Sequence, residues 1–330
     1  MSRINIAVKF GNNELIFYRQ GVGVIARHQS FLAVSQRGGR IKVKAFGNDA
    51  QKIADSKNVF VYKPFDRLDV KNHRMATILV RKILDDCIMD KFFLTSINVL
   101  IAVPCAMNHK QLSDLKSVFK YAGCRKVTFV QNGVCSRAYF DQFSPNDYAV
   151  MVDIGKFVTD ISVLNDFEFL KGKVCLLGGV DMDSALQTYI KDNFDLSINI
   201  QTAENLKKNI GSLYNKDLFS TEFLGVNEDN SVINQQITAN EIRVAISNTY
   251  DHIFDLVSEF IDSLSNEIKI QLTKTGIVLS GGASCIPGLF EYANKKFAYP
   301  IHIVNNPKES SILGAGKLLS KDKQFIKISF

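Results

Sequence analysis

The chain has 330 residues, of which 46% are hydrophobic and 22% charged, and its formal net charge is +7 at pH 7. This balance is typical of a globular protein and excludes an intrinsically disordered chain. The length exceeds that of one ordinary core, which predicts two domains or one domain with insertions. The basic excess belongs either to a solvated surface or to contact with an anionic partner such as lipid, nucleotide or polyanion.

The six cysteines form no CxxC pair, and most of them lie among apolar residues. They are expected to be buried, reduced thiols in a cytosolic protein. The N-terminal MSRINIAVKF has a strand pattern rather than that of a signal peptide, and no apolar run reaches the roughly 18 residues of a membrane span. We therefore expect a cytoplasmic protein whose membrane contact, if any, is peripheral.

The first half of the chain has several strand patterns followed by helix patterns. Strands are predicted in INIAVKF, ELIFYRQ, VGVIARHQSFLAVS and RIKVKAFG, with glycine-containing turns between the first three. An amphipathic helix over 72–90 precedes the apolar strand NVLIAVP, and a second helix over 109–123 ends at Gly123. The strand KVTFVQ and a helix over 133–143 complete this half.

The pattern restarts after Pro145. YAVMVDIGKFVTDISVLND predicts a hairpin with a glycine turn, FLKGKVCLLGG a further strand and DMDSALQTYIKDNF a helix. Because strand, glycine turn and strand also occur in this order at residues 4–18, we predict two similar halves with a cleft between them.

The last third is mostly helical. TAENLKKNIGSLY is amphipathic, and 240–268 is long enough for one helix or two. TGIVLSGGASCIPGLFEYANKKF then predicts a strand, a Gly-Gly turn and a helix, YPIHIV a last strand and ESSILGAGKLLSK a closing helix.

The turn of the second hairpin has the outline of a phosphate-binding loop. Asp153 and Gly155 begin it, but its tip is Lys156-Phe157-Val158. Phosphate-binding loops normally have glycines here, because the missing side chains let backbone N–H groups approach the anion. From these residues alone, the turn is either an altered nucleotide site or an ordinary hairpin.

Four segments resemble the MreB family of bacterial actins, in the family's order. They are GNNELIFYRQGVGVIARHQS, IAVPCAMNHKQLSDLKSVFKYAGCRKVTFV, QTAENLKKNIGS and TGIVLSGGASCIPGLFEYANKKFAYPIHIVNNPKESSILGAGKLL. The resemblance covers essentially residues 4–319. It implies the actin-like α/β fold, with two similar α/β halves, each with a small subdomain, around a central nucleotide cleft.

The resemblance also implies domain boundaries. Domain I is expected over 1–146, with a small subdomain inserted at about 32–75, and is closed by the C-terminal helix 309–320. Domain II is expected over 147–308 with a small helical subdomain at about 182–245, and 321–330 is a basic and apolar tail.

Several elements of the family's hydrolytic site are altered in this chain. Where the family has the acid that helps to hold the water shell of Mg²⁺, this chain has Lys9, so magnesium coordination from that side is expected to fail. The position of the catalytic glutamate falls on Gln131 or Asn132, whose amides position water but cannot take its proton. Thr159 keeps the family's residue. We expect weak or absent ATP hydrolysis and assign neither a catalytic residue nor a metal ligand.

Binding of ATP or ADP is expected to be better preserved. The resemblance assigns contacts with the base and ribose to Glu204 and Lys207, for which an ordinary surface ion pair is the alternative. Lys156 is expected either to donate to a phosphate oxygen or to point to solvent. Lys9 and Asp153, on loops that face each other across the cleft in this fold, are predicted to form an ion pair. The expected nucleotide-binding residues are Gly11, Asn12, Asn13, Glu14, Asp153, Gly155, Lys156, Phe157, Val158, Glu204, Asn205, Leu206, Lys207, Gly281, Gly282, Ala283 and Ser284.

A membrane contact is expected at the segment Lys91, Phe92, Phe93 and Leu94, which occupies the place of a membrane-inserting loop in some MreB proteins. The alternative is that both phenylalanines pack into the core. The tail KDKQFIKISF is either a second contact or a disordered end. The protein would then lie at the inner face of the cell membrane.

The function implied by the resemblance is that of a filament-forming cytoskeletal protein involved in cell shape or motility. Its partners are expected to be copies of itself and other cytoskeletal proteins, without nucleic acid. The alternatives are a filament with full ATPase activity and a non-filamentous, regulatory pseudo-ATPase. A sugar kinase or chaperone-type ATPase of the same fold is disfavoured by the length, which leaves no room for a peptide-binding domain.

Overall fold

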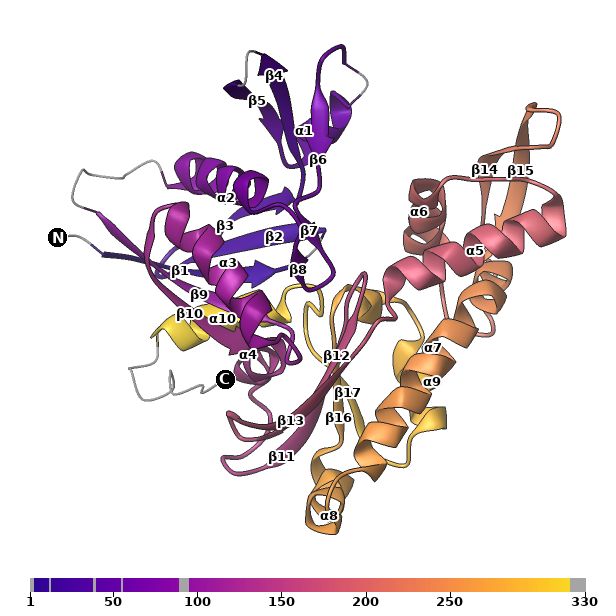
Figure 1. The fold of residues 1–330 in the computed structure, drawn as a ribbon. Coiled ribbons are helices and arrows are strands. Elements are labelled where there is room, and N and C mark those ends of the chain that lie inside the picture. Colours follow the sequence, from indigo (N-terminus) through magenta and orange to yellow (C-terminus); the bar gives the residue numbers. More distant parts are fainter. Residues whose placement is uncertain (1–2, 12, 38–39, 55, 89–94, 321–330) are drawn as a thin grey trace. The chain divides into compact units, whose positions relative to one another are not determined.

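The computed structural model describes residues 3–11, 13–37, 40–54, 56–88 and 95–320 (Figure 1). The chain divides into two compact units. Unit 1 comprises Met1–Asp141, Phe167–Phe169 and Ser310–Phe330, and unit 2 comprises Gln142–Asp166 and Leu170–Glu309.

Unit 1 is built on a five-stranded sheet in the order β10-β9-β1-β2-β3. The strand β1 pairs antiparallel with β2 and parallel with β9, which pairs parallel with β10. Alternate apolar residues of β1, including Ile6 and Val8, pack with the buried faces of α2 and α3, and α10 contacts α4, β1 and β2. A separate small sheet has the order β5-β4-β6. The elements of unit 1 are β1 (Arg3–Phe10), β2 (Glu14–Arg19), β3 (Gly23–Gln29), β4 (Leu32–Arg37), β5 (Arg40–Phe46), α1 (Asn48–Lys52), β6 (Phe60–Tyr62), β7 (Phe65–Asp66), β8 (Asp69–Val70), α2 (His73–Cys87), β9 (Ser96–Val103), α3 (His109–Tyr121), β10 (Cys124–Gln131), α4 (Asn132–Tyr139) and α10 (Ser310–Ser320).

Unit 2 repeats this arrangement in a sheet of order β13-β12-β11-β16-β17. Its central strand β11 pairs antiparallel with β12 and parallel with β16, which pairs parallel with β17. Its core joins alternate residues of β11 and β12 to α5 and to the long helix α7. The elements of unit 2 are β11 (Tyr148–Ile154), β12 (Thr159–Asn165), β13 (Glu168–Cys175), α5 (Gly179–Phe194), α6 (Ile200–Ile210), β14 (Ser220–Val226), β15 (Val232–Thr238), α7 (Ala239–Asp262), α8 (Asn266–Thr275), β16 (Ile277–Ser280), the 3₁₀ helix η1 (Gly282–Cys285), α9 (Leu289–Lys296) and β17 (Ile301–Ile303).

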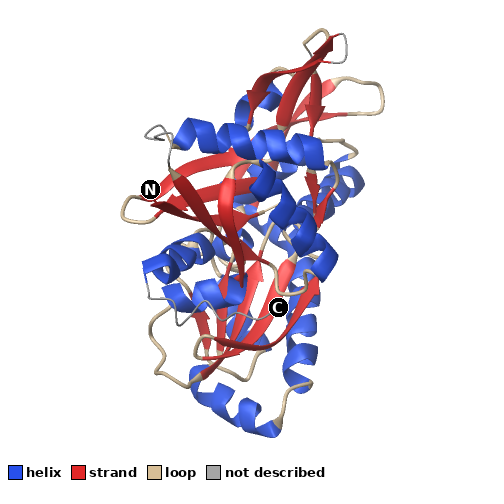
Figure 2. Ribbon diagram, turned by 60° about the vertical axis from the view of Figure 1, so that its left-hand side comes forward, coloured by secondary structure: helices blue, strands red, loops and turns tan. Residues whose placement is uncertain are grey.

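The same strand order in two sheets confirms the prediction of two similar α/β halves. Figure 2 shows strands flanked by helices throughout the molecule. None of the described helices combines the length and the apolar character that crossing a membrane requires.

Four local expectations need correction or completion. The strand predicted from residue 22 to 35 is two strands, β3 and β4, which belong to different sheets. The segment 240–268 is two helices, because Ser265 begins a new one by accepting a hydrogen bond from the Ile268 N–H. The subdomain expected to be helical also contains the hairpin β14–β15. Cys285 is exposed rather than buried, and Cys87 and Cys105 are half-buried.

Candidate functional site

The turn between β11 and β12 lies against the beginning of α5. A side chain at Gly155 has no room, since an added Cβ would lie 2.8 Å from the Val158 carbonyl oxygen. The Gly155 N–H donates to that oxygen (2.9 Å), and the Gly155 carbonyl accepts from the Gly179 N–H (2.9 Å). The Gly155 N–H is therefore used inside the turn and is not available to an anion.

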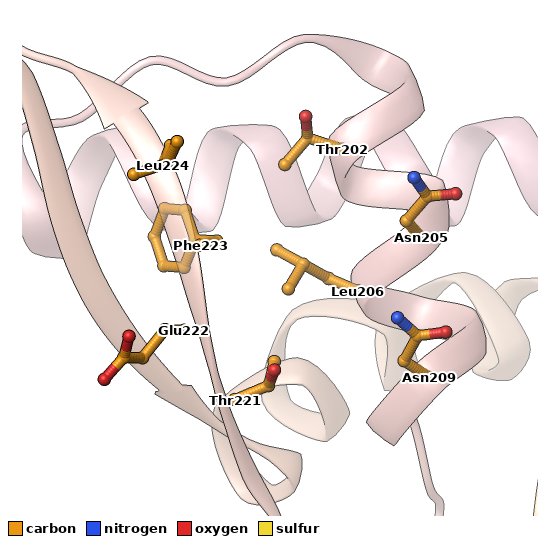
Figure 3. Close-up of a pocket in the computed structure, with 8 residues that line it drawn as sticks. All are labelled: Thr202, Asn205, Leu206, Asn209, Thr221, Glu222, Phe223 and Leu224. Atoms are coloured by element: carbon orange, nitrogen blue, oxygen red, sulfur yellow. The ribbon is translucent and has the colours of Figure 1, made fainter.

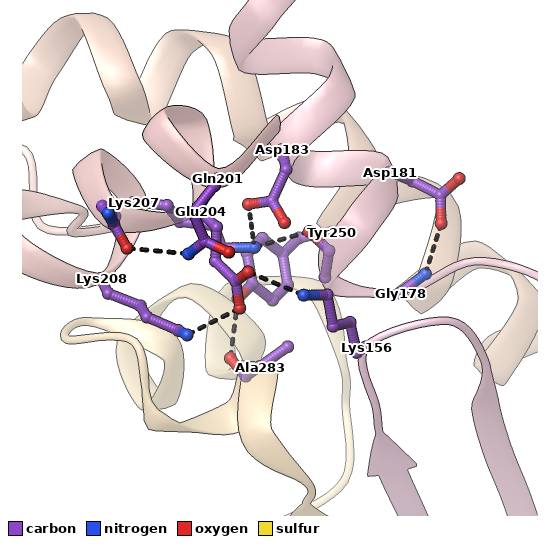
Figure 4. A network of polar contacts seen from close by, with 12 residues as sticks. Lys156, Gly178, Asp181, Asp183, Gln201, Glu204, Lys207, Lys208, Tyr250 and Ala283 are labelled. Carbon is purple, nitrogen blue, oxygen red and sulfur yellow. Dashed lines mark hydrogen bonds and ion pairs between the residues drawn. The ribbon is translucent and has the colours of Figure 1, made fainter. Parts of the chain in front are cut away.

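Lys156, at the tip of this turn, reaches the helix α6. Its Nζ lies 2.7 Å from Glu204 Oε2, and the two side chains are 28% and 12% exposed (Figure 4). Lys208, one turn further along α6, lies 2.6 Å from the other oxygen, Oε1. Lys156 therefore does not point to solvent but forms an ion pair with Glu204 of the same unit.

The carboxylate of Glu204 thus lies between two cations. Burial opposes its ionisation, but the hydrogen bonds from Lys156 and Lys208 outweigh burial and lower the pKa of Glu204 to about 2. Glu204 is consequently a charged acceptor whose two oxygens each have a lysine partner.

Lys207 is held separately, by α5. Its Nζ lies 2.6 Å from Asp183 Oδ1, and the side chains are only 13% and 1% exposed. Lys207 also donates to the Gly179 carbonyl oxygen. Burial raises the pKa of Asp183 and lowers that of Lys207, each toward its neutral form, and their mutual attraction opposes both shifts. Glu204 and Lys207, considered above as a surface ion pair, are therefore each paired with a different residue.

A cavity of about 120 Å³ opens beside these lysines. Three expected nucleotide-binding residues, Lys207, Gly282 and Ala283, line it. The buried hydroxyl of Tyr250 donates to the Ala283 carbonyl oxygen (2.7 Å), and burial raises the pKa of Tyr250. The other lining residues, which sequence reasoning missed, are Lys208, Gly211, Tyr250, Cys285, Ile286 and Pro287. Of these, Lys208 had a local signal, since it follows Glu204 by four residues on one helix.

The Gly-Gly turn after β16 brings the chain close to the end of β11, where the β11–β12 turn begins. Gly281 has φ +88°, and an added Cβ would clash with Asp153 Oδ1 and the Ile154 carbonyl. Gly282 is open, with Lys308 Cγ at 4.0 Å as the nearest atom to an added Cβ. The backbone therefore requires glycine at position 281 but not at position 282.

Other expected binding residues of unit 2 lie outside this cavity. Leu206 is buried in the core at 5% exposed. Asn205 faces a second hollow, of about 280 Å³, between α6 and β14 (Figure 3). Ser284 is buried and donates to the Ser280 carbonyl oxygen (2.6 Å). Phe157 and Val158 are half-buried in the turn.

In unit 1, Gly11 and Asn13 lie in the turn between β1 and β2, Glu14 begins β2, and Asn12 lies outside the described residues. An added Cβ on Gly11 would lie 2.7 Å from the Glu14 carbonyl oxygen. The Ser30 N–H donates to the Asn13 carbonyl oxygen (2.9 Å). Lys9 belongs to unit 1 and Asp153 to unit 2, and their pairing stays a prediction.

The residues at the family's catalytic position begin α4. Gln131 and Asn132 are 2% and 6% exposed, and their side-chain oxygens have no hydrogen-bond partner among the described residues. Buried acceptors of this kind are rare and suit an ordered water. Thr159, by contrast, is buried and donates to the Leu177 carbonyl oxygen (2.9 Å), so its hydroxyl serves the structure.

Two further expectations concern the membrane and the metal. Lys91, Phe92, Phe93 and Leu94 lie outside the described residues, as does the tail 321–330. Among the residues that the structure describes, no group of three or more His, Cys, Asp or Glu side chains is placed to hold a metal ion.

Comparison with known proteins gives consistent matches over nearly the whole chain. The cell shape-determining protein MreB of Escherichia coli (strain K12) is 23% identical over 322 residues, covering 96% of this chain and 93% of that protein. MreB 5 of Spiroplasma citri, solved with AMPPNP bound, is 22% identical with a TM-score of 0.86, covering 96% of this chain and 95% of the other. A MamK double helical filament has 17% identity and a TM-score of 0.81, covering 97% and 100%.

The two structural likenesses confirm the actin-like fold predicted from the sequence. The family model described as MreB/Mbl protein matches residues 3–327. Because that match spans almost the entire chain, this protein belongs to the MreB/Mbl family.

Proposed function

We propose that this protein is a filament-forming cytoskeletal protein of MreB type, which binds an adenine nucleotide and hydrolyses it weakly or not at all. The observation that carries the proposal is the family match over residues 3–327. The relative in Escherichia coli is named a cell shape-determining protein, and the MamK relative forms a double helical filament. A role in cell shape or motility, exercised in the cytoplasm through self-association, follows from these likenesses.

The cavity in unit 2 fits part of a nucleotide. Gly282 leaves open space at its wall, and Lys207 and Lys208 supply positive charge beside it. Its volume of about 120 Å³ is below the roughly 300–1,000 Å³ of typical ligand pockets, which suits the base rather than a whole nucleotide. The Spiroplasma citri relative binds AMPPNP, a nucleotide analogue.

Weak hydrolysis is proposed from the residues at the altered positions. The bound nucleotide would supply the phosphate to be cleaved, and this chain supplies only neutral amides at Gln131 and Asn132 to orient water. Replacing a general base by an amide costs about 10²–10⁴-fold in rate. Lys9 is also expected to lower the rate, because a cation at the position of the family's acid cannot help to hold the water shell of Mg²⁺.

Phosphate release at saturating ATP and Mg²⁺ tests this proposal. We expect a slow rate, which rises when Lys9→Asp is combined with Gln131→Glu. Lys9→Asp with Asn132→Asp is the matched control and shows which of the two amides holds the catalytic position. A wild-type rate equal to that of an MreB with unaltered loops would instead favour a fully active ATPase filament.

Assembly and membrane contact are tested separately. Electron microscopy with and without ATP is expected to show filaments under both conditions, and monodisperse particles in both would favour a regulatory pseudo-ATPase. We also propose a peripheral contact with the inner face of the membrane through Phe92 and Phe93. Liposome co-sedimentation should fall in the Phe92→Ser, Phe93→Ser variant, because each buried aromatic side chain contributes about 1.5–3 kcal/mol.

A further inference from the structure

Three lysines and two acids meet where the β11–β12 turn approaches α5 and α6 (Figure 4). The lysines are Lys156 from the turn and Lys207 and Lys208 from α6, and the acids are Asp183 and Glu204. The residues joined by these ion pairs carry three positive and two negative formal charges, and a further acid, Asp181, accepts a hydrogen bond from the Gly178 N–H nearby.

The three lysines differ in how firmly they are held. Lys207 is 13% exposed and has two partners, the 1% exposed Asp183 and the Gly179 carbonyl. Lys208 is 62% exposed and pairs with Glu204 along its own helix. Lys156 is intermediate, at 28% exposed, and Glu204 is its ion-pair partner.

The cost of moving each lysine follows from these contacts. Displacing Lys207 would leave Asp183 charged, buried and uncompensated, which proteins tolerate poorly. Displacing Lys156 leaves Glu204 compensated, because Lys208 still lies 2.6 Å from Oε1. Lys156 and Lys208 can therefore each change partner without creating an unpaired buried charge, and of the two Lys156 belongs to the turn that has the outline of a phosphate-binding loop.

A phosphate group is the anion that competes best for such a lysine. It offers three strong acceptor oxygens and a charge of up to about −2, against the single charge of a carboxylate. The cavity is near enough, because Lys208 both lines it and contacts the carboxylate that holds Lys156.

We propose that Lys156 makes the nucleotide site selective for phosphate-bearing ligands by exchanging Glu204 for a phosphate oxygen when a nucleotide binds. This inference rests on the proposed nucleotide-binding function and names a residue that discriminates between ligands of that site. Glu204 is then the resting partner of Lys156 and competes with the ligand for it. A nucleoside without phosphate offers no replacement, so it leaves the Lys156–Glu204 pair in place.

The test compares the dissociation constants of ADP and adenosine, measured by calorimetry, in the wild type and in Lys156→Met, Glu204→Gln and the double variant. Lys156→Met should raise the dissociation constant of ADP about 10-fold or more, since it removes a charge-assisted hydrogen bond. It should change the dissociation constant of adenosine less than about twofold. Glu204→Gln should lower the dissociation constant of ADP several-fold, because it removes the carboxylate that competes with the phosphate for Lys156. That gain should vanish in the double variant, where no lysine is left to be released.

Two controls separate this role from a loss of charge or of folding. Lys191→Met removes a cation from another place on α5, where its partner is the 82% exposed Glu228, and should leave the ratio of ADP to adenosine affinity within about threefold of the wild type. Lys156→Arg retains the charge and should keep most of the selectivity for ADP. Thermal melts of each variant confirm that the fold is intact before the affinities are compared.

The outcomes distinguish the inference from the proposal on which it rests. Equal weakening of ADP and adenosine in Lys156→Met, or tighter ADP binding, would overturn partner exchange while leaving nucleotide binding in place. A ratio reduced as strongly by Lys191→Met would also overturn it. Failure of the wild type to bind any adenine nucleotide would overturn the proposed function, and the inference with it.

Discussion

The β1–β2 turn of unit 1 and the β11–β12 turn of unit 2 occupy the same place in two sheets of identical strand order. Each begins with a glycine. A Cβ added to Gly11 would lie 2.7 Å from the Glu14 carbonyl oxygen, and a Cβ added to Gly155 would lie 2.8 Å from the Val158 carbonyl oxygen. The backbone of both turns thus excludes a side chain at this position. Their glycines are explained by the fold and say nothing about ligands.

The side chains around those glycines differ. Two residues before the glycine, unit 1 has Lys9 and unit 2 has Asp153, so equivalent positions carry opposite charges. The first turn is held by Ser30, whose N–H and Oγ donate to backbone oxygens. The second is held by α5 and by the pair of Lys156 with Glu204. A repeated backbone therefore has two different chemistries, because the close approach restricts the glycine and leaves the neighbouring side chains free to vary.

The largest effect is expected from the charge network of unit 2. Lys207→Met leaves Asp183, at 1% exposed, without its cation, which should lower the free energy of unfolding by about 3–5 kcal/mol. Lys208→Met, at a 62% exposed position, should cost less than about 1 kcal/mol. Denaturant titrations of both variants measure the difference, and similar losses would contradict the distinction between a fixed and an exposed lysine.

The loss in Lys207→Met should also depend on pH. Burial raises the pKa of Asp183 in the folded protein, and without Lys207 only the weaker attraction of Lys156 opposes that rise. An acid whose pKa is higher in the folded state favours folding at low pH and opposes it as pH rises through the folded pKa. The deficit should therefore shrink as the pH is lowered from neutrality.

A smaller loss is expected at the glycine that brings β16 to the second turn. Gly281→Ala places a Cβ against Asp153 and Ile154 at φ +88°, at a cost of about 2–4 kcal/mol. Gly282→Ala is the matched control, since its nearest neighbour is 4.0 Å away. Thermal denaturation should separate the two variants clearly, and equal melting temperatures would mean that the turn can move aside.

The equivalence of the two turns is tested by Gly11→Ala and Gly155→Ala. Each added methyl group meets a backbone oxygen at nearly the same distance, so each should cost about 1–3 kcal/mol. The two losses should differ by less than about 1 kcal/mol. A loss in only one variant would show that the turns differ in backbone freedom as well as in side chains.

Apart from the Lys208→Met control, the smallest effect is expected from Glu204→Gln, about 1–2 kcal/mol at neutral pH, because it weakens two partly exposed hydrogen bonds to lysine. The pKa of Glu204 falls from 4.5 to about 2 on folding. Its contribution should be complete above pH 4.5 and disappear as the pH falls toward 2. Stability curves of wild type and variant should therefore converge in acid, and a difference independent of pH would mean that Glu204 acts through packing.

Sequence reasoning succeeded where the signal was local. The restart of the strand–glycine–strand pattern predicted the duplication, because alternation and turn residues act over a few neighbouring positions. The hairpin β14–β15 was missed for a related reason. Leu224 and Val232 are each 64% exposed, so its apolar residues do not follow the buried-face alternation by which strands are recognised.

The family, the two α/β halves and three cavity residues, Lys207, Gly282 and Ala283, could be predicted from the sequence alone. The partners in the ion pairs could not, because they depend on how the chain folds. Glu204 and Lys207 are three residues apart on α6, which predicts an ion pair between them. In the structure Glu204 pairs with Lys156 of the β11–β12 turn, and Lys207 pairs with Asp183 of α5. Ion pairing depends on a few ångströms between side chains from distant segments, and that distance is set by how the core packs those segments together.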